Sequence, residues 1–300
     1  MQSLWMLFAS FVFAMMGVCV KLASELYSTS EIVMYRGLMG SALLLLLSRL
    51  RGDSLKTPLP RAHLSRGVIG VTALWLWFYS IGRLPLAMSM TLNSMAPIWI
   101  AAILLSLAWW RGARRLEWGC AAAVLTSFAG VTLLLQPSMQ ASQWFAALVA
   151  LISSVISALA YLQVRKLGQL GEPEYRVVFY FSVTGAIAGA LGNLVASALA
   201  PQQAAWHGHT PHGALLLAGV GLSATVAQMA MTRAYRLGNP LVTANLQYTG
   251  IVFSSIWGIL LWRDVLSWMG WAGIAIILAS GSAATFYNGR SRPAPLAAKP

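Results

Sequence analysis

Arg36 offers the most specific chemistry in this sequence, because it is a basic residue inside a long apolar segment, 32–50. It lies about five residues from one end of that segment, a depth of roughly 7 Å if the segment is helical. A charge inside a membrane segment usually faces a cavity or a partner. A guanidinium binds carboxylates and phosphates in bidentate fashion, so Arg36 indicates an anion clamp. The alternative is a structural arginine that snorkels outward or binds loop carbonyls. Glu31 is five residues away and off the face of Arg36, so we do not expect the two to pair.

A second group of candidates consists of uncharged donors, acceptors and aromatic rings near the middle of four other apolar segments. Together they suit a site for an amphipathic organic molecule. For any single member, ordinary packing and interhelical hydrogen bonding, worth about 0.6 kcal/mol per bond, is the simpler explanation. The members are Trp75, Tyr79, Asn93, Ser94, Trp99, Gln228, Asn245, Gln247 and Tyr248.

Pro97 stands in the middle of segment 88–109 and predicts a broken helix there. Proline lacks an N–H group, so the carbonyl of Asn93 loses its helical partner. In hydrocarbon such a group must be satisfied by protein or water, which indicates a cavity. An offset of 153 residues brings Gly250 onto Pro97, and we expect a second kink there. The same offset pairs Arg83 with Arg236, Leu84 with Leu237 and Trp109 with Trp262.

The composition places these residues in an integral membrane protein. Hydrophobic residues make up 58% of the chain and charged residues 9%, against about 25% charged in a soluble domain. The apolar segments are hydrophobic on all sides and too long for membrane strands, which alternate. We therefore predict an all-α membrane protein with ten transmembrane helices. The segments are 4–22, 32–50, 67–84, 88–109, 118–135, 144–163, 177–199, 213–233, 241–262 and 268–287.

The positions of the basic residues predict the orientation. With the N-terminus in the cytoplasm, most of the 20 Lys and Arg, Arg66 among them, fall in cytoplasmic connections or the C-terminal tail. Both termini are then cytoplasmic, in a bacterial inner membrane. This distribution explains the net charge of +13 without nucleic acid. The first segment has no basic flank or clean cleavage site and is expected to be an uncleaved helix.

The two halves of the chain repeat each other. At an offset of 145, residues 31–40 lie over residues 176–185, with Tyr35 on Tyr180 and Gly40 on Gly185. We therefore expect repeats over 1–143 and 144–287, followed by a disordered tail, 288–300. Each repeat has five helices, an odd number, so the second crosses the membrane in the opposite sense. Inverted repeats around a midplane site are a recurring transporter architecture.

These features resemble the drug/metabolite transporter superfamily, in its ten-helix EamA-type branch. The motifs are the MYRG sequence around Arg36, the run 84–97 that ends in Pro97, and the WRD turn at 262–264. The resemblance implies a basket of helices around a central cavity, with the fifth and tenth helices outside. It implies transport of small metabolites, often amino acids or related compounds and frequently outward. We therefore expect export of such compounds by alternating access, without a cofactor.

Other functions find less support. A membrane-embedded enzyme needs a nucleophile, base or metal cluster, and no apolar segment contains Asp or Glu. A flippase for a lipid or a lipid-linked sugar stays open as an alternative. A sensor would normally carry a soluble output domain, which this sequence does not indicate. His207, His209 and His212 crowd one outer loop, which we interpret as solvated rather than as a zinc site. Without an embedded carboxylate, we expect facilitated diffusion, exchange or coupling through substrate charge.

The expected partners are a small-molecule substrate and the lipid bilayer. Gly185 and Gly189 form a GxxxG pattern, which indicates close helix packing or a weak homodimer of an otherwise monomeric chain. Cys19 and Cys120 fall near opposite faces of the membrane, too far apart for a disulfide, so we predict two free thiols.

Overall fold

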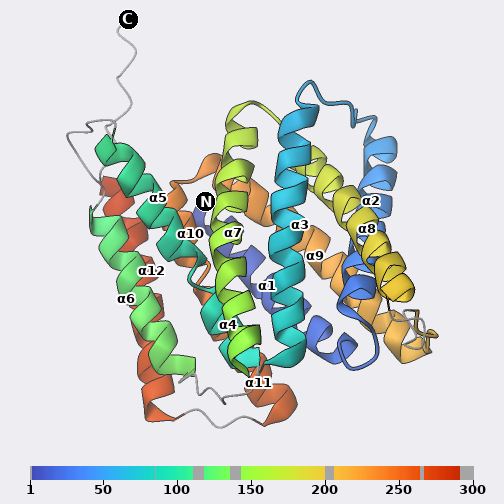
Figure 1. Cartoon of the computed structure of the whole chain (residues 1–300). Coiled ribbons are helices and arrows are strands. Elements are labelled where there is room, and N and C mark those ends of the chain that lie inside the picture. Colours follow the sequence, from blue (N-terminus) through green and yellow to red (C-terminus); the bar gives the residue numbers. More distant parts are fainter. Residues whose placement is uncertain are drawn as a thin grey trace, which may run out of the picture.

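The computed structural model describes residues 2–84, 86–110, 118–135, 143–199, 206–263 and 267–290. These residues form helices and connections, with no strand among them (Figure 1). The helices are α1 (Gln2–Ala23), α2 (Thr29–Arg51), α3 (Pro60–Arg83), α4 (Leu86–Asn93), α5 (Ala96–Trp110), α6 (Trp118–Leu135), α7 (Trp144–Gln169), α8 (Glu174–Leu199), α9 (Pro211–Leu237), α10 (Pro240–Leu246), α11 (Thr249–Trp262) and α12 (Trp268–Arg290).

Helices α4 and α5 are two parts of one span, and so are α10 and α11, so the twelve helices make ten spans. By length and composition, seven stretches of the described chain are long and apolar enough to cross a membrane, and shorter apolar helices lie in α6 and α12. The predicted all-α class with ten transmembrane helices is confirmed. Helix α12 continues to Arg290, beyond the predicted start of the tail at 288, and residues 291–300 lie outside the described part.

The helices pack as two inverted five-span repeats, α1–α6 and α7–α12. The most extensive contacts all join one repeat to the other: α2 with α8, α6 with α12, α1 with α9, and α3 with α7. Helices α1, α2, α3 and α6 of the first repeat correspond to α7, α8, α9 and α12 of the second. The α1–α9 contact is therefore equivalent to the α3–α7 contact, and the α2–α8 and α6–α12 contacts each join two equivalent helices. In Figure 1, α6 and α12 lie at the left and α2 and α8 at the right of the helices between them.

Glycines let α2 and α8 approach backbone to backbone. A Cβ atom at Gly37 would clash with the backbone of Ala186, and one at Gly189 would clash with the backbone of Met34. At Gly185 a Cβ would meet only the Val71 side chain, at an ordinary 3.8 Å. Gly189 of the GxxxG pattern therefore serves packing inside the chain.

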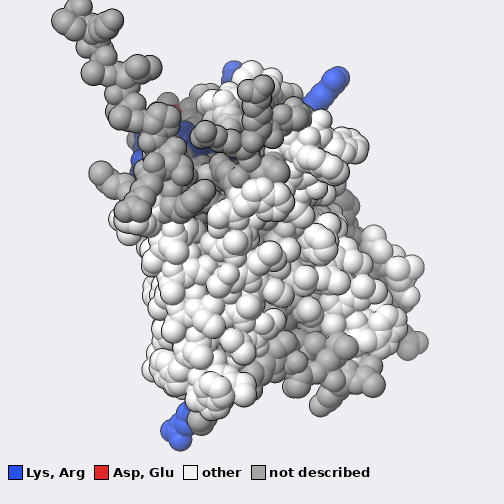
Figure 2. All heavy atoms as spheres, turned by 90° about the vertical axis from the view of Figure 1, so that its left-hand side faces the viewer, with Lys and Arg blue, Asp and Glu red and all other residues white. Residues whose placement is uncertain are grey.

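The outer surface suits a bilayer. In Figure 2 the visible Lys and Arg side chains gather toward the two ends of the molecule, and the described surface between them is uncharged. Tryptophan is enriched at membrane–water interfaces, and several tryptophans near the helix ends are exposed here, including Trp109 (74%) and Trp268 (75%). Cys19 is a free thiol; the Cys120 side chain lies outside the described part.

The two broken spans break at equivalent positions. At the 153-residue offset, Asn93, the last residue of α4, meets Leu246, the last of α10, and Ala96, the first of α5, meets Thr249, the first of α11. Tight turns bridge both gaps: Met95 N donates to Leu92 O (3.2 Å), and Tyr248 N donates to Asn245 O (3.2 Å). The structure thus places a helix break directly before Pro97 and directly before Gly250.

Candidate functional site

The two helix breaks face one pocket, which we call the central pocket. About 650 Å³ of this pocket is not filled by atoms, open solvent included. Helices α4, α5 and α11 and the residues within the two breaks line one part of it, and α1, α3, α7 and α9 complete the wall. The lining residues are Met6, Ser10, Phe13, Ala14, Trp77, Met90, Asn93, Ser94, Pro97, Tyr161, Met231, Gln247, Tyr248, Gly250, Ile251 and Ser254.

The polar groups of the central pocket are held in place by neighbours. Asn93 Oδ1 accepts a hydrogen bond from Ser153 Oγ (3.4 Å), and Gln247 Nε2 donates to the Tyr235 hydroxyl (2.5 Å). The Tyr235 ring stacks on Tyr161, with centroids 5.6 Å apart. The buried Tyr248 hydroxyl has no hydrogen-bond partner among the described residues. The pocket therefore combines positioned amides with aromatic walls and one unpartnered hydroxyl.

A second pocket adjoins the first, and we call it the arginine pocket because Arg36 and Arg66 line it. About 440 Å³ of it is not filled by atoms, open solvent included. The residues that line both pockets are Phe13, Trp77, Asn93 and Tyr161. The two pockets are therefore neighbouring parts of one cavity. The remaining lining residues of the arginine pocket are Met16, Gly70, Ala73, Leu74, Ser157, Ala160, Phe181 and Gln228.

Both arginines are buried and share one aromatic ring. Arg36 is 3% and Arg66 2% exposed. Their guanidinium carbons lie 4.8 Å and 4.2 Å from the centroid of the Phe181 ring. Arg36 thus turns inward instead of snorkelling, and no described loop carbonyl accepts a hydrogen bond from its buried Nε and Nη1 atoms.

Six of the ten predicted site residues line this cavity, and four do not. Arg36, Asn93, Ser94, Gln228, Gln247 and Tyr248 line it. Trp75 packs against Gly192 of α8, and the Tyr79 ring lies under the Arg83 guanidinium at 3.8 Å. Trp99 Nε1 donates to Ser154 Oγ (3.0 Å), and Asn245 Nδ2 donates to the Ser280 carbonyl (3.3 Å). The contacts of Trp75, Trp99 and Asn245 join neighbouring helices, and the Tyr79–Arg83 contact lies within α3.

Sequence reasoning missed Arg66, Trp77, Tyr161 and Phe181. Arg66 was counted among the cytoplasmic charges because the apolar segment begins only at Gly67. Helix α3 begins earlier, at Pro60, so Arg66 lies inside the helix. Proline favours the first position of a helix, so Pro60 was a signal that could have predicted this start.

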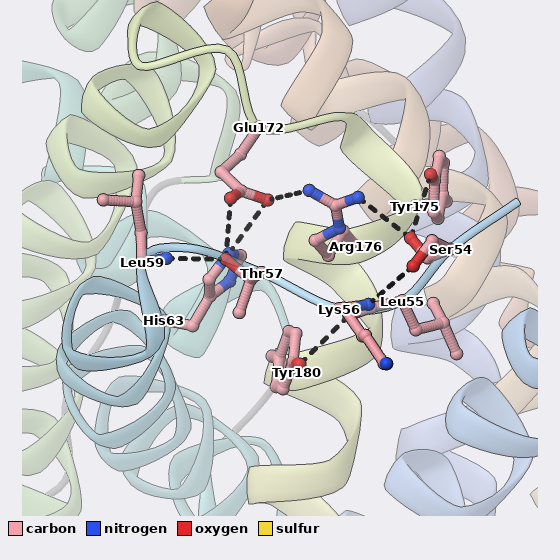
Figure 3. Close-up of polar contacts among 10 residues, drawn as sticks. All are labelled: Ser54, Leu55, Lys56, Thr57, Leu59, His63, Glu172, Tyr175, Arg176 and Tyr180. Atoms are coloured by element: carbon pink, nitrogen blue, oxygen red, sulfur yellow. Dashed lines mark hydrogen bonds and ion pairs between the residues drawn. The ribbon is translucent and has the colours of Figure 1, made fainter.

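Polar contacts tie the two repeats together at one end of the molecule, in a cluster that we call the Glu172 clasp (Figure 3). Glu172 Oε1 accepts a hydrogen bond from Thr57 Oγ1 (2.6 Å), and Oε2 accepts one from Arg176 Nη1 (3.0 Å). His63 Nε2 lies 3.2 Å from Glu172 Oε2. Burial by itself would raise the pKa of Glu172, but its contacts with Thr57, Arg176 and His63 lower that pKa below its ordinary value. The α2–α3 connection is thereby bound to the α7–α8 connection.

The opposite connections carry a second cluster, the Glu31 clasp. Glu31 Oε1 accepts from the backbone N–H of His207 (2.8 Å), and Glu31 Oε2 lies 2.7 Å from His207 Nδ1. His209 contacts the hydroxyls of Tyr27 (3.1 Å) and Tyr35 (2.8 Å). His207 and His209 are exposed, as expected for a solvated loop. They also contact Glu31 and Tyr35 of α2 and Tyr27 of the α1–α2 connection, and the sequence alone did not predict these partners. Among the described residues, no group of three His, Cys, Asp or Glu could hold a metal.

The comparison with known proteins matches the whole architecture. The model of the EamA-like transporter family matches residues 1–136 and 144–283. The pseudopaline exporter CntI of Pseudomonas aeruginosa is 31% identical over 276 residues, 91% of each chain. An uncharacterized transporter of Helicobacter pylori is 26% identical over 280 residues, 92% of this chain and 91% of that one. A protein crystal structure shares the fold, with a TM-score of 0.75, 18% identity and coverage of 96% and 98% of the two chains. This multi-pass chain therefore belongs to the EamA-like transporter family of the drug/metabolite transporter superfamily and is a membrane transporter, not an enzyme.

Proposed function

We propose that this transporter exports a small organic metabolite from the bacterial cytoplasm by alternating access at the central pocket. The observation that carries the proposal is the meeting of two equivalent helix breaks, before Pro97 and before Gly250, at one cavity lined by both repeats. Broken helices of inverted repeats are where transporters of several folds bind their substrates. The name of the 31% identical relative, an exporter, supports the outward direction.

The two clasps support alternating access. The Glu172 clasp ties the α7–α8 connection to the α2–α3 connection. At the opposite end, the Glu31 clasp ties the α1–α2 connection and the first turn of α2 to the equivalent α8–α9 connection. Opening one clasp while the other holds would expose the cavity to one side of the membrane at a time. The basic residues Arg49, Arg51, Lys56 and Arg61 lie near the Glu172 clasp in the sequence, which favours a cytoplasmic position for it and for both termini.

The lining favours an amphipathic substrate such as an amino acid or a related compound. Aromatic rings of Phe13, Trp77 and Tyr161 offer apolar faces, and Asn93 and Gln247 offer amide hydrogen bonds. In the part of the chain that the structure describes, no acidic residue lines the cavity, which favours exchange or facilitated diffusion over coupling to protons by an embedded carboxylate. Both repeats of the chain contribute to this lining, which favours a monomer as the transporting unit.

Transport by purified protein tests this proposal. A thermal-shift screen of metabolites would identify a stabilising compound, and proteoliposomes would measure its counterflow. Gln247→Ala and Asn93→Ala are expected to reduce the flux at least tenfold. Gln163→Ala is the matched control, because Gln163 contacts Ser65 and does not line the cavity. Unchanged flux in both pocket variants, or movement of labelled lipid but of no soluble metabolite, would overturn the proposal.

A further inference from the structure

We infer that the arginine pocket is an anion-binding subsite, in which Arg36 and Arg66 together hold a carboxylate or phosphate group of the transported molecule. This inference rests on the proposed transport function and assigns its substrate class: an organic anion with more acidic than basic groups. The uncharged part of the molecule lies in the adjoining central pocket.

The first observation is that both guanidiniums are buried without a counter-charge. Only 3% of Arg36 and 2% of Arg66 is exposed, and none of the described residues that line their pocket is acidic. The Nε and Nη1 atoms of both side chains are buried and have no hydrogen-bond partner among the described residues. Buried charges in proteins are ordinarily paired, because desolvation is costly. A ligand oxyanion would supply the missing partner.

The second observation is that each described carboxylate either has another hydrogen-bond or ion-pair partner or is exposed to solvent. Glu31 accepts hydrogen bonds from Ser28 and His207, and Glu172 belongs to its own clasp. Glu174 forms an ion pair with Arg236 at 2.7 Å. Glu25 and Asp53 are exposed. No described acidic residue therefore neutralises the two arginines.

The third observation is that the pocket holds both arginines in position and leaves the Nε and Nη1 atoms of each without a partner among the described residues. Both guanidiniums lie over the Phe181 ring, and such a cation–π contact orients a cation while using none of its N–H groups. Gly70 is part of the same arrangement: a Cβ atom there would overlap the Arg66 guanidinium. A planar guanidinium with its N–H groups available matches the two oxygens of a carboxylate or phosphate.

The position of the subsite fits a transported molecule. Asn93 and Tyr161 line both pockets, so a ligand whose acidic group reaches the arginines would pass these side chains. Its remainder would then lie between the two helix breaks. Two positive charges without a nearby acid would repel an organic cation, so the same arrangement provides selectivity.

Binding to the purified protein tests the inference with three five-carbon probes of similar length: glutarate, its neutral diamide glutaramide, and the cation cadaverine. Inorganic phosphate is a fourth probe. Glutarate or phosphate is expected to bind, and glutaramide and cadaverine at least tenfold more weakly. Binding of glutarate would assign a carboxylate and binding of phosphate alone a phosphoryl group; both outcomes support an oxyanion site. Equal binding of glutarate and glutaramide, or binding of neither anion, would overturn it.

Variants separate a charge effect from a folding effect. Arg36→Gln and Arg66→Gln are expected to lose at least tenfold in anion affinity, and Arg36→Lys and Arg66→Lys to recover part of it. Arg83→Gln is the matched control, since Arg83 also lies over an aromatic ring, Tyr79, but outside the cavity. Anion affinity that is unchanged in both Gln variants would refute the subsite.

The same preparation distinguishes the two proposals. If anions bind through the arginines but no compound is transported, the proposed transport function fails and the subsite stands. If a metabolite is transported and the flux is the same in wild type and both Gln variants, the subsite fails and the transport function stands.

Discussion

Replacing Arg66 by methionine is expected to stabilise the protein and to abolish its response to anions. Methionine keeps an unbranched side chain over Phe181 and removes the charge. The two guanidinium carbons lie 4.8 Å and 4.2 Å from one ring centroid, so their separation cannot exceed the sum of these distances. Two like charges at that separation repel by about 2 kcal/mol when the effective dielectric constant is about 20.

Other terms change in the same substitution. The lost cation–π contact costs about 1 kcal/mol. Removing a buried, unpaired charge adds stability, and replacing buried charges by apolar side chains of similar volume often stabilises by about 1–4 kcal/mol. The net expectation for Arg66→Met is a gain of about 1–3 kcal/mol, which corresponds to a rise in Tm of a few degrees.

Thermal unfolding of purified wild type and Arg66→Met, with and without glutarate, measures this effect. Without the anion the variant is expected to unfold at the higher temperature. With the anion the wild type gains stability and the variant does not, because a ligand stabilises only a form that binds it. Arg83→Met, which removes an exposed guanidinium from the Tyr79 ring, is the control and is expected to gain nothing. A fall in Tm for Arg66→Met would refute the reasoning, since it would show that the Arg66 side chain stabilises the folded protein.

Three further predictions concern the packing and the clasps. Gly37→Ala is expected to lower stability by about 1–3 kcal/mol, because a Cβ would clash with the α8 backbone, whereas Gly185→Ala should be neutral; unfolding of the two variants checks this. Because its contacts depress the pKa of Glu172, the stabilisation from this carboxylate is present above its ordinary pKa and is lost as pH falls through the lowered value. The difference in Tm between wild type and Glu172→Gln should therefore shrink from pH 7 to acidic pH, and a constant difference would contradict the prediction. Glu31→Gln is expected to release the loop at His207, which faster proteolysis after Trp206 would report; a cleavage rate equal to that of wild type would count against the Glu31 clasp.

Much of the fold could be predicted from the pattern of hydrophobic residues. Segments of apolar residues long enough to cross a bilayer specify helices, because only helices or closed barrels satisfy the backbone in hydrocarbon. An odd number of helices in each repeat makes the repeats inverted. The offset of 153 residues that pairs Pro97 with Gly250 also aligns the ends of α4 and α10.

The candidate site was predicted less completely, for reasons visible at particular residues. Trp75 and Trp77 are two positions apart on α3, so they point in different directions, and only the position of α8 decides which one faces the cavity. Arg66 directly precedes the apolar segment 67–84, so the sequence suggests a charge outside the helix. Only the start of α3 at Pro60 shows that Arg66 lies inside it. Pro97 lacks a backbone N–H group, which disfavours a continuous helix at the first break. Gly250 keeps its N–H group, which donates to Gln247 O (2.9 Å), so the residue type at this position does not by itself require the second break.

By itself, the sequence determined that this chain crosses a membrane ten times in two opposed halves, because hydrophobicity, segment length and proline act locally along the chain. Only the tertiary structure decided which polar side chains meet. Arg36 and Arg66 come from helices whose N-termini lie at opposite ends of the molecule, and both guanidiniums contact the ring of Phe181 on α8. Contacts of this kind depend on how helices cross, and in a chain that is apolar on nearly every face no sequence period specifies that crossing.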